Sequence, residues 1–251
     1  MDEHDDITRT HVSLPAGSEI GHYRIVEKIG AGGMGEVYLA EDLKLHRRIA
    51  LKFLPANLSS DEELRARFIR EARAAASLNH PNIIHIYEVD EFKGRPYFAM
   101  EHVEGHSLHH YCHKESLGIN QIVEIAVQLA QGLGEAHRAG IVHRDIKATN
   151  IIVDRSGRAR ILDFGLATVK DGDELTRTGS TLGTVSYMSP EQVAGKDVDK
   201  RSDLFSLGIV LYELIAGHTP FRRDNQGATL KAILSDAPEP LARFDIHNRS
   251  T

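Results

Sequence analysis

The 251-residue sequence contains a single cysteine, Cys112, and no tryptophan. One cysteine excludes an intramolecular disulfide and fits a reducing compartment, so we expect a cytoplasmic location. The longest apolar run, residues 204–216, is interrupted by Glu213 and is too short to cross a bilayer, so we expect no membrane segment within this chain. The acidic first residues also lack the apolar core of a signal peptide.

Basic residues form no dominant block, and the formal net charge is −6. A nucleic-acid-binding protein of this size would need a basic face to contact phosphates, so we expect no nucleic-acid partner. The 15 histidines are scattered, and no His-Glu-x-x-His pattern occurs. The sequence therefore does not predict a structural zinc site.

The order of periodic segments predicts a two-lobed α+β protein. Residues 1–20 are polar and aperiodic, which is typical of a flexible tail. The expected N-lobe, 21–101, has five strands and one helix, and the expected C-lobe, 104–251, is mostly helical. The expected strands cover 23–29, 36–40, 49–54, 84–88 and 96–101, and the expected helices cover 60–78, 120–140, 202–216 and 227–234, with Ser60 and Asn120 as N-caps of the first two.

A glycine-rich string, 30–35, has the form G-x-G-x-x-G. The string alone leaves open a dinucleotide-binding turn, a phosphate-covering hairpin and a plain turn. A dinucleotide-binding loop opens a helix, whereas residues 36–40 continue here as a strand. This continuation favours a hairpin whose backbone N–H groups can approach phosphate oxygens.

A lysine, Lys52, interrupts the apolar strand 49–54. In the following helix Glu71 shares one face with apolar residues, because Leu64, Phe68, Glu71, Ala75 and Leu78 are spaced by three or four positions. An unpaired carboxylate in an apolar stripe is costly, so Lys52 is the expected partner of Glu71. An exposed Glu71 and a solvent-facing Lys52 remain the alternative interpretation.

The most specific motif is 143–150, which reads His-Arg-Asp-Ile-Lys-Ala-Thr-Asn, and Asp163-Phe164-Gly165 follows it. Phosphoryl transfer needs a carboxylate near the incoming hydroxyl, a cation near the migrating phosphoryl group and oxygen ligands for Mg²⁺. Asp145 supplies the first and Lys147 the second, while Asn150 and Asp163 supply the third.

These motifs, together with segments 32–42, 78–83 and 187–192, resemble the eukaryotic-like (Hanks-type) serine/threonine protein kinases, most of all their bacterial branch. The resemblance covers about 20–238 and implies ATP and Mg²⁺ as cofactors. It implies that Asp145 accepts the proton of the substrate hydroxyl, while Lys147 and Lys52 contact phosphates. It also implies that Glu71 anchors Lys52 and that Asn150 and Asp163 bind Mg²⁺. The ATP-binding residues that it implies are Ile29, Gly30, Ala31, Gly32, Gly33, Met34, Gly35, Glu36, Val37, Ala50, Lys52, Met100, Glu101, Val103, Asn150, Ile152 and Asp163.

The same resemblance implies regulation by autophosphorylation, for which we expect Thr176 and Thr178 as the sites and Arg144 as the residue that receives the phosphate. It further implies that Asp203 ties down the catalytic-loop backbone. The expected partners are proteins bearing Ser or Thr and a second copy of the chain during autophosphorylation.

One departure concerns the carboxyl-terminal end. The family's domain normally continues for two or three more helices, one of which carries an arginine that pairs with the glutamate matching Glu191. We therefore expect a C-lobe truncated at its C-terminal end. The leading function is an ATP-dependent serine/threonine kinase, either cytoplasmic or the cytosolic part of a longer membrane-anchored kinase. The alternative is a catalytically impaired nucleotide-binding or scaffolding fragment.

Overall fold

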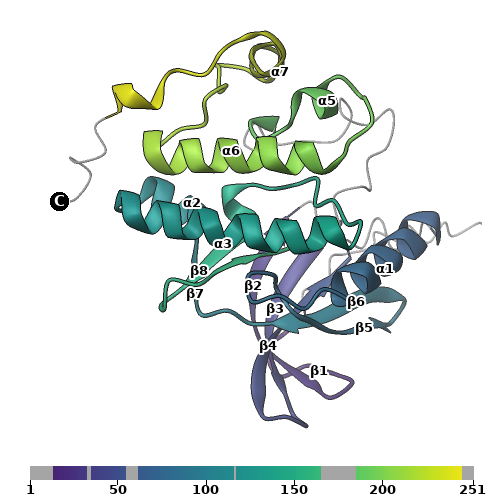
Figure 1. Ribbon diagram of the computed structural model, residues 1–251. Coiled ribbons are helices and arrows are strands. Elements are labelled where there is room, and N and C mark those ends of the chain that lie inside the picture. Colours follow the sequence, from purple (N-terminus) through teal and green to yellow (C-terminus); the bar gives the residue numbers. More distant parts are fainter. Residues whose placement is uncertain (1–13, 33–34, 55–61, 116, 165–184, 245–251) are drawn as a thin grey trace, which may run out of the picture.

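The computed structural model describes residues 14–32, 35–54, 62–115, 117–164 and 185–244. Its first lobe is an antiparallel sheet in the order β1-β2-β3-β4-β6-β5, covered on one side by helix α1 (Figure 1). The bounds of these elements are β1 Glu19–Ile20, β2 Tyr23–Gly32, β3 Gly35–Asp42, β4 Arg47–Phe53, α1 Glu62–Ala76, β5 Ile86–Phe92 and β6 Arg95–Glu101.

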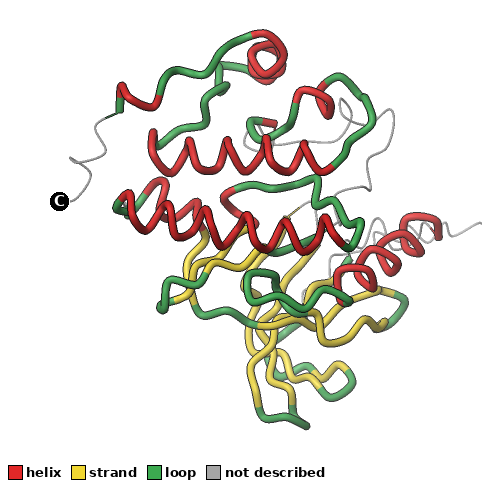
Figure 2. Tube along the Cα trace, viewed as in Figure 1, coloured by secondary structure: helices red, strands yellow, loops and turns green. Residues whose placement is uncertain are grey.

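The second lobe is mostly helical and lies on the opposite side of the molecule from β1 (Figure 2). A small antiparallel sheet, in the order β7-β8-β9, lies between its helices and the first lobe. Its elements are β7 Gly105–Ser107, α2 Leu108–His113, α3 Ile119–Arg138, a 3-10 turn Ala148–Asn150, β8 Ile151–Asp154, β9 Ala159–Ile161, α5 Pro190–Val193, α6 Lys200–Ala216, α7 Gln226–Ser235 and a 3-10 turn Leu241–Arg243.

Strand alternation divides the core of the first lobe between the two faces of its sheet. On one face Ile49 and Leu51 pack with Ile25 and Tyr38 in a cluster confined to this lobe. On the other face the intervening Ala50 belongs to the main core, which also contains residues of α1, α3 and α6. Lys52 follows Ala50 by two positions, so the strand pattern directs it toward the second lobe.

The ordered sheet begins before the predicted start of the N-lobe. Ile20 is buried and pairs with Tyr23 across β1 and β2. The Leu14 backbone N–H donates a hydrogen bond to the Tyr38 hydroxyl at 3.2 Å. The sheet thus has six strands rather than the five predicted. The prediction of a tail through residue 20 was wrong for residues 14–20, while residues 1–13 lie outside the described part.

Two helices begin at other residues than predicted. Helix α3 has Gly118 as its N-cap rather than Asn120, because the Gln121 side chain accepts a hydrogen bond from the Gly118 N–H at 3.0 Å. Helix α6 begins earlier than predicted, since Asp199 is its N-cap and accepts from the Arg201 N–H at 2.8 Å. The predicted cap Ser60 lies outside the described residues.

None of the described helices is both long and apolar enough to span a bilayer.

Candidate active site

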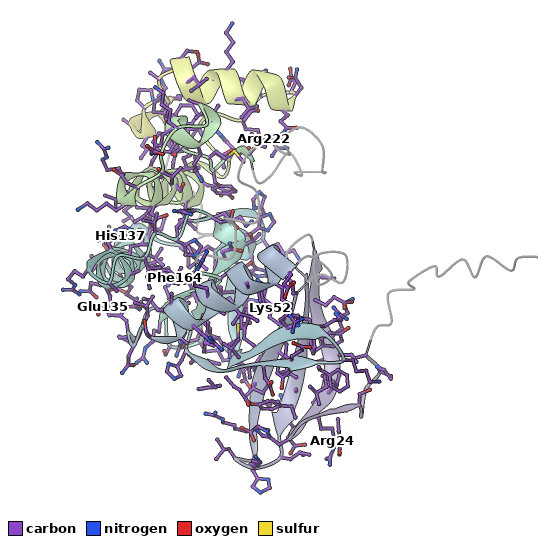
Figure 3. All side chains as sticks on the ribbon, turned by 90° about the vertical axis from the view of Figure 1, so that its right-hand side faces the viewer. Arg24, Lys52, Glu135, His137, Phe164 and Arg222 are labelled. Atoms are coloured by element: carbon purple, nitrogen blue, oxygen red, sulfur yellow. The ribbon has the colours of Figure 1, made fainter. Side chains whose placement is uncertain are left out.

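Lys52 lies between the two lobes and is only 3% exposed. Its Nζ contacts Asp163 Oδ1 at 2.6 Å, so the ammonium joins strand β4 to the segment after β9. Figure 3 shows Lys52 and Phe164 in the middle of the molecule, between the sheet and helices α6 and α7. The predicted partner Glu71 lies on α1, but its side chain is outside the described part. The described partner of Lys52 is therefore a different carboxylate.

The backbone at Asp163 is held in a conformation that few non-glycine residues adopt. Its φ is +59°, in the left-handed region. The next residue, Phe164, is buried and its ring meets the His143 ring edge-on at 4.7 Å between centroids. Packing of Phe164 in the core thus fixes the position from which Asp163 reaches Lys52.

The catalytic loop brings three of the predicted residues into direct contact. Lys147 Nζ lies 2.8 Å from Asp145 Oδ2, and Asn150 Nδ2 donates to the same oxygen at 2.9 Å. Asn150 Nδ2 also donates to the Asp145 backbone carbonyl at 2.9 Å. Because both bonds use the amide nitrogen, the Asn150 side-chain oxygen is left as an acceptor. The second carboxylate oxygen of Asp145 accepts neither of these bonds.

His143 connects this loop to the segment after β9, which carries Asp163. Its Nδ1 accepts from the Asp145 N–H at 3.2 Å, so the ring proton is on Nε2, which donates to the Leu162 carbonyl at 2.6 Å. His143 is completely buried. The ring therefore holds Asp145 and the residue preceding Asp163 at a fixed separation.

Helix α6 supplies a buried carboxylate beneath the loop. Asp203 Oδ2 accepts from the His143 N–H at 2.8 Å and from His137 Nε2 at 2.7 Å, while Oδ1 accepts from the Arg144 N–H at 2.7 Å. Figure 3 shows His137 on the side of α3 that faces α6. Arg144 has φ +67°, and these bonds stabilise that unfavourable backbone. The predicted role of Asp203 is seen in its contacts.

Comparison with known proteins agrees with this arrangement. Residues 23–249 match the family described as Protein kinase domain. The chain belongs to this family. Serine/threonine-protein kinase PrkC of Bacillus subtilis is 43% identical over 222 residues, which are 87% of this chain and 34% of PrkC. Serine/threonine-protein kinase PknB of Mycolicibacterium smegmatis is 40% identical over 228 residues, which are 88% of this chain and 36% of PknB.

Solved structures lead to the same family. The kinase domain of Mycobacterium tuberculosis PknI has a TM-score of 0.70 and 29% sequence identity, with 90% of this chain and 92% of that chain covered. The predicted two-lobed kinase fold and the resemblance to bacterial serine/threonine kinases are confirmed. The domain is that of a phosphotransferase, and protein kinases generally use ATP with Mg²⁺. This kinase chain spans about a third of the length of the curated relatives it matches.

Several of the predicted nucleotide-binding residues of the kinase lie on strands β2, β3, β4 and β6 of the first-lobe sheet. Gly32 pairs with Gly35 at the end of the β2–β3 hairpin, and Val37 lies opposite Lys52 across β3 and β4. Ala50 lies opposite Met100 across β4 and β6. The described members of the predicted nucleotide-binding set are Ile29, Gly30, Ala31, Gly32, Gly35, Glu36, Val37, Ala50, Lys52, Met100, Glu101, Val103, Asn150, Ile152 and Asp163. The other two members, Gly33 and Met34, lie outside the described residues, and so do the predicted phosphorylation sites Thr176 and Thr178.

Sequence reasoning missed two residues that position the kinase site. Arg160 Nε lies 3.1 Å from Glu101 and its NH1 lies 2.8 Å from Asp154, so β9 is fastened to the connection between the lobes. Gln192 donates to the Arg144 carbonyl at 2.8 Å. Gln192 could have been noticed, because Ser189 and Gln192 form a capping box, whereas an arginine on a short strand gives no comparable signal.

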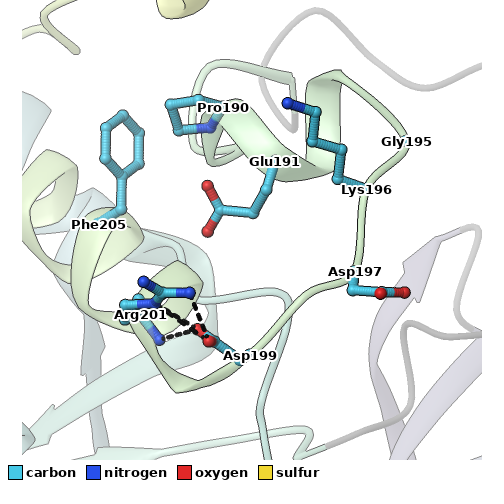
Figure 4. Close-up of a pocket in the computed structure, with 8 residues that line it drawn as sticks. All are labelled: Pro190, Glu191, Gly195, Lys196, Asp197, Asp199, Arg201 and Phe205. Atoms are coloured by element: carbon cyan, nitrogen blue, oxygen red, sulfur yellow. Dashed lines mark hydrogen bonds and ion pairs between the residues drawn. The ribbon is translucent and has the colours of Figure 1, made fainter.

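A cavity of about 800 Å³ lies between α5 and the start of α6, and none of the predicted catalytic residues lines it (Figure 4). Glu191 lines it and accepts a hydrogen bond from the Ser202 hydroxyl. Burial raises the pKa of Glu191, but the bond from Ser202 and those from backbone and Ser189 outweigh it and hold the pKa below its ordinary value. Within the described part of the chain no arginine forms an ion pair with Glu191. The cavity's lining comprises Pro190, Glu191, Gly195, Lys196, Asp197, Asp199, Arg201 and Phe205.

Proposed function

We propose that this chain transfers the γ-phosphoryl group of ATP to Ser or Thr hydroxyls of proteins. The observation that carries the proposal is the meeting of two groups of residues between the lobes. The Lys52–Asp163 pair and the Asp145–Lys147–Asn150 cluster come from separate segments, and His143 bonds to both segments. A dehydrogenase site would have no need of this combination of charges.

The donor groups fit Mg²⁺. Hydrogen bonding directs the amide nitrogen of Asn150 to Asp145 and leaves its oxygen available, and Asp163 has a second carboxylate oxygen beyond the one that contacts Lys52. Amide and carboxylate oxygens are ligands that Mg²⁺ accepts together with nucleotide phosphates. Asn150 and Asp163 would therefore hold the ion, whose charge would neutralise phosphate oxygens during transfer.

The acid–base role falls to Asp145. One carboxylate oxygen is engaged by Lys147 and Asn150, so the other can accept the proton of the incoming hydroxyl. Lys147 would contact the γ-phosphoryl group from its place beside Asp145. Lys52 would contact the α- and β-phosphates, and we propose that Glu71 anchors it when nucleotide draws the ammonium away from Asp163.

The adenine site would lie where the sheet meets the second lobe. Ala50 and Met100 are cross-strand neighbours at this place, and the Arg160 contact fixes Glu101, whose backbone would bind the adenine ring with that of Val103. Ile29 is 46% exposed and Ile152 is partly exposed, so both have apolar surface that a planar ring could cover. The glycine hairpin 30–35 would close over the phosphates.

Regulation would act through Arg144. Its Nε is buried and has no hydrogen-bond partner among the described residues, although its backbone is fixed by Asp203 and Gln192. A buried guanidinium nitrogen without an acceptor is a suitable receiver for phosphate. We propose that autophosphorylation at Thr176 and Thr178 supplies it, which requires a second copy of the chain as a transient partner. We propose that the chain acts in the cytoplasm, either by itself or as the cytosolic part of a longer membrane-anchored kinase.

Intact-mass spectrometry after incubation with Mg-ATP tests the activity. The native chain should gain increments of one phosphate, and Asp145→Asn should gain none. Asp224→Asn is the matched control, because Asp224 is exposed in the loop before α7 and should leave incorporation unchanged. Nucleotide-dependent stabilisation without any phosphate gain would overturn the proposal and favour the alternative nucleotide-binding or scaffolding fragment, for which the comparisons give no support.

A further inference from the structure

A second cluster of metal-binding side chains lies outside the catalytic site, where α2 contacts α6. Ligand atoms of Cys112, His113 and Glu213 all lie within 4.8 Å of one another. Cys112 and His113 end helix α2, and Glu213 is in the last turn of α6, 101 positions later in the chain. None of these residues takes part in the phosphoryl-transfer site described above.

The three ligand types together select a particular class of metal. A thiolate, an imidazole and a carboxylate are all ligands of Zn²⁺, whereas Mg²⁺ prefers oxygen ligands alone. At usual Zn²⁺ bond lengths, neighbouring ligand atoms of a tetrahedral site lie about 3.5 Å apart. The separations between the ligand atoms would therefore shorten by up to about 1.3 Å on binding. His113 is exposed at the end of its helix, so its side chain has room to make this adjustment.

The imidazole of His113 is already oriented as a ligand. Its Nδ1 lies 3.0 Å from the His109 carbonyl, to which it can donate, and its Nε2 lies 4.0 Å from Glu213 Oε1. A bond from one ring nitrogen to a backbone carbonyl fixes the tautomer in which the other nitrogen is free to bind a metal. The nitrogen that faces the cluster is thus the one with an available lone pair.

Glu213 divides its two oxygens between a structural bond and the cluster. The carboxylate is buried, and its Oε2 accepts a hydrogen bond from the buried hydroxyl of Tyr187. Oε1 is the oxygen that faces His113. A metal bound at Oε1 would leave the bond from Tyr187 intact, as a second shell that orients the carboxylate.

We propose that Cys112, His113 and Glu213 form a Zn²⁺ site that fastens α2 to α6, with water as the fourth ligand. The site needs neither nucleotide nor phosphoryl transfer, so it stands independently of the proposed kinase activity. By joining the end of α2 to α6, it would stabilise the second lobe beside Tyr187.

Cobalt substitution tests the site, because Cys112 is the only cysteine in the chain. The purified full chain is stripped with a chelator and titrated with Co²⁺, and a thiolate-to-cobalt charge-transfer band should appear and saturate at one equivalent. Zn²⁺ should abolish the band by displacement. Other histidines on the surface can bind cobalt but cannot produce this band. Its absence at saturating Co²⁺ would overturn the proposal.

Substitutions then assign the ligands. Competition with a chromophoric chelator should show that Cys112→Ser and His113→Gln each weaken Zn²⁺ binding by at least about 100-fold. His106→Gln is the matched control, since His106 is an exposed histidine just before α2 that stacks on His110 and not on the cluster. Equal Zn²⁺ affinity in Cys112→Ser and His106→Gln would also contradict the site.

A folding readout covers the case in which a variant is unstable. Zn²⁺ should raise the thermal unfolding midpoint of the native chain and of His106→Gln, and it should slow alkylation of Cys112 in both. A native chain whose midpoint and alkylation rate do not respond to Zn²⁺ would refute the proposal without recourse to any variant.

Discussion

Replacing Asp203 by asparagine tests whether α6 holds the catalytic loop in its active form. The carboxylate is 1% exposed and accepts three hydrogen bonds, two at Oδ2 and one at Oδ1. Asparagine keeps the shape but has one oxygen and one NH₂ group. In its better orientation the oxygen takes the Oδ2 position, and the NH₂ group then faces the Arg144 N–H, which loses its acceptor.

The cost follows from these contacts. Losing a hydrogen bond to a charged group, together with an unsatisfied buried N–H, costs about 2–4 kcal/mol. A domain of this kind has a free energy of unfolding of about 5–15 kcal/mol, so the variant should fold with a large part of its stability lost. Since Arg144 relies on this bond to keep a positive φ, the loop should also rearrange and kcat should fall more than the affinity for ATP.

Urea unfolding and phosphate incorporation, measured on the same preparations, check both effects. Asp199→Asn is the control, because Asp199 caps the same helix from an exposed position and asparagine is an equally good cap. We expect a smaller loss of stability in this control, and full activity. If the free energy of unfolding of Asp203→Asn stays within about 0.5 kcal/mol of that of the native chain, and its kcat is unchanged, the proposed role of Asp203 is refuted.

Three further substitutions probe other contacts. Lys52→Met should lower kcat by about 100- to 1,000-fold, because it removes the cation paired with Asp163; an unchanged rate in a phosphate-incorporation assay would contradict its role. Arg160→Gln should lower the free energy of unfolding, measured in urea, by about 1–3 kcal/mol, and it should weaken ATP binding because Glu101 loses its ion pair. An affinity for ATP that calorimetry finds unchanged would exclude the second effect. Burial opposes ionisation of Asp154, yet hydrogen bonds from Ser156, Arg160 and the backbone hold its pKa well below the ordinary value of 3.8. The contribution of Asp154 to stability is therefore present above that value and is lost as pH falls below it. Asp154→Asn should lower the free energy of unfolding at pH 7, and this free energy should then fall less steeply in acid than it does for the native chain. Equal slopes of the free energy of unfolding against pH in acid would refute this.

Local motifs predicted that the residues of the 143–150 loop lie together, because these residues are close in sequence. Asp145, Lys147 and Asn150 fall within six positions, so one tight turn suffices to bring their side chains together. Their type and spacing led to a hypothesis about their chemistry, and the structure shows that their side chains are in contact. What spacing could not supply was the direction of the Asn150 amide, which depends on the backbone carbonyl of Asp145 as well as on its side chain.

The partner of Lys52 shows a limit of pattern reasoning. Helical periodicity placed Glu71 on the apolar face of α1, and the burial of Phe68, Ala75 and Leu78 agrees with that face. Among the described side chains, the carboxylate that contacts Lys52 is that of Asp163, 111 positions away in the chain. The side chain of Glu71 lies outside the described part, so its pairing with Lys52 stays a prediction. When two carboxylates can approach one ammonium, periodicity does not rank them, since the outcome depends on how the lobes meet.

Short elements were missed for a related reason. Strand β1 has two residues, too few for any alternation to be detected, and it is defined by pairing with β2 and by the burial of Ile20. Helix α5 has four residues and carries Gln192 to the catalytic loop. In both cases tertiary contacts decide the local structure, so the sequence gives only weak local signals.

The Cys112–His113–Glu213 cluster extends this argument to metal binding. A search of the sequence for metal sites relies on ligands spaced along one element, and by that criterion the histidines appeared scattered. Two ligands of this cluster are adjacent at the end of α2, while the third comes from the last turn of α6, a helix that the sequence pattern assigned to the apolar core. A buried glutamate on such a helix is costly unless it has partners, and one bond from Tyr187 satisfies only one of its oxygens. The unfavourable placement of Glu213 was therefore visible in the sequence, but its ligand neighbours required the packing of α2 on α6.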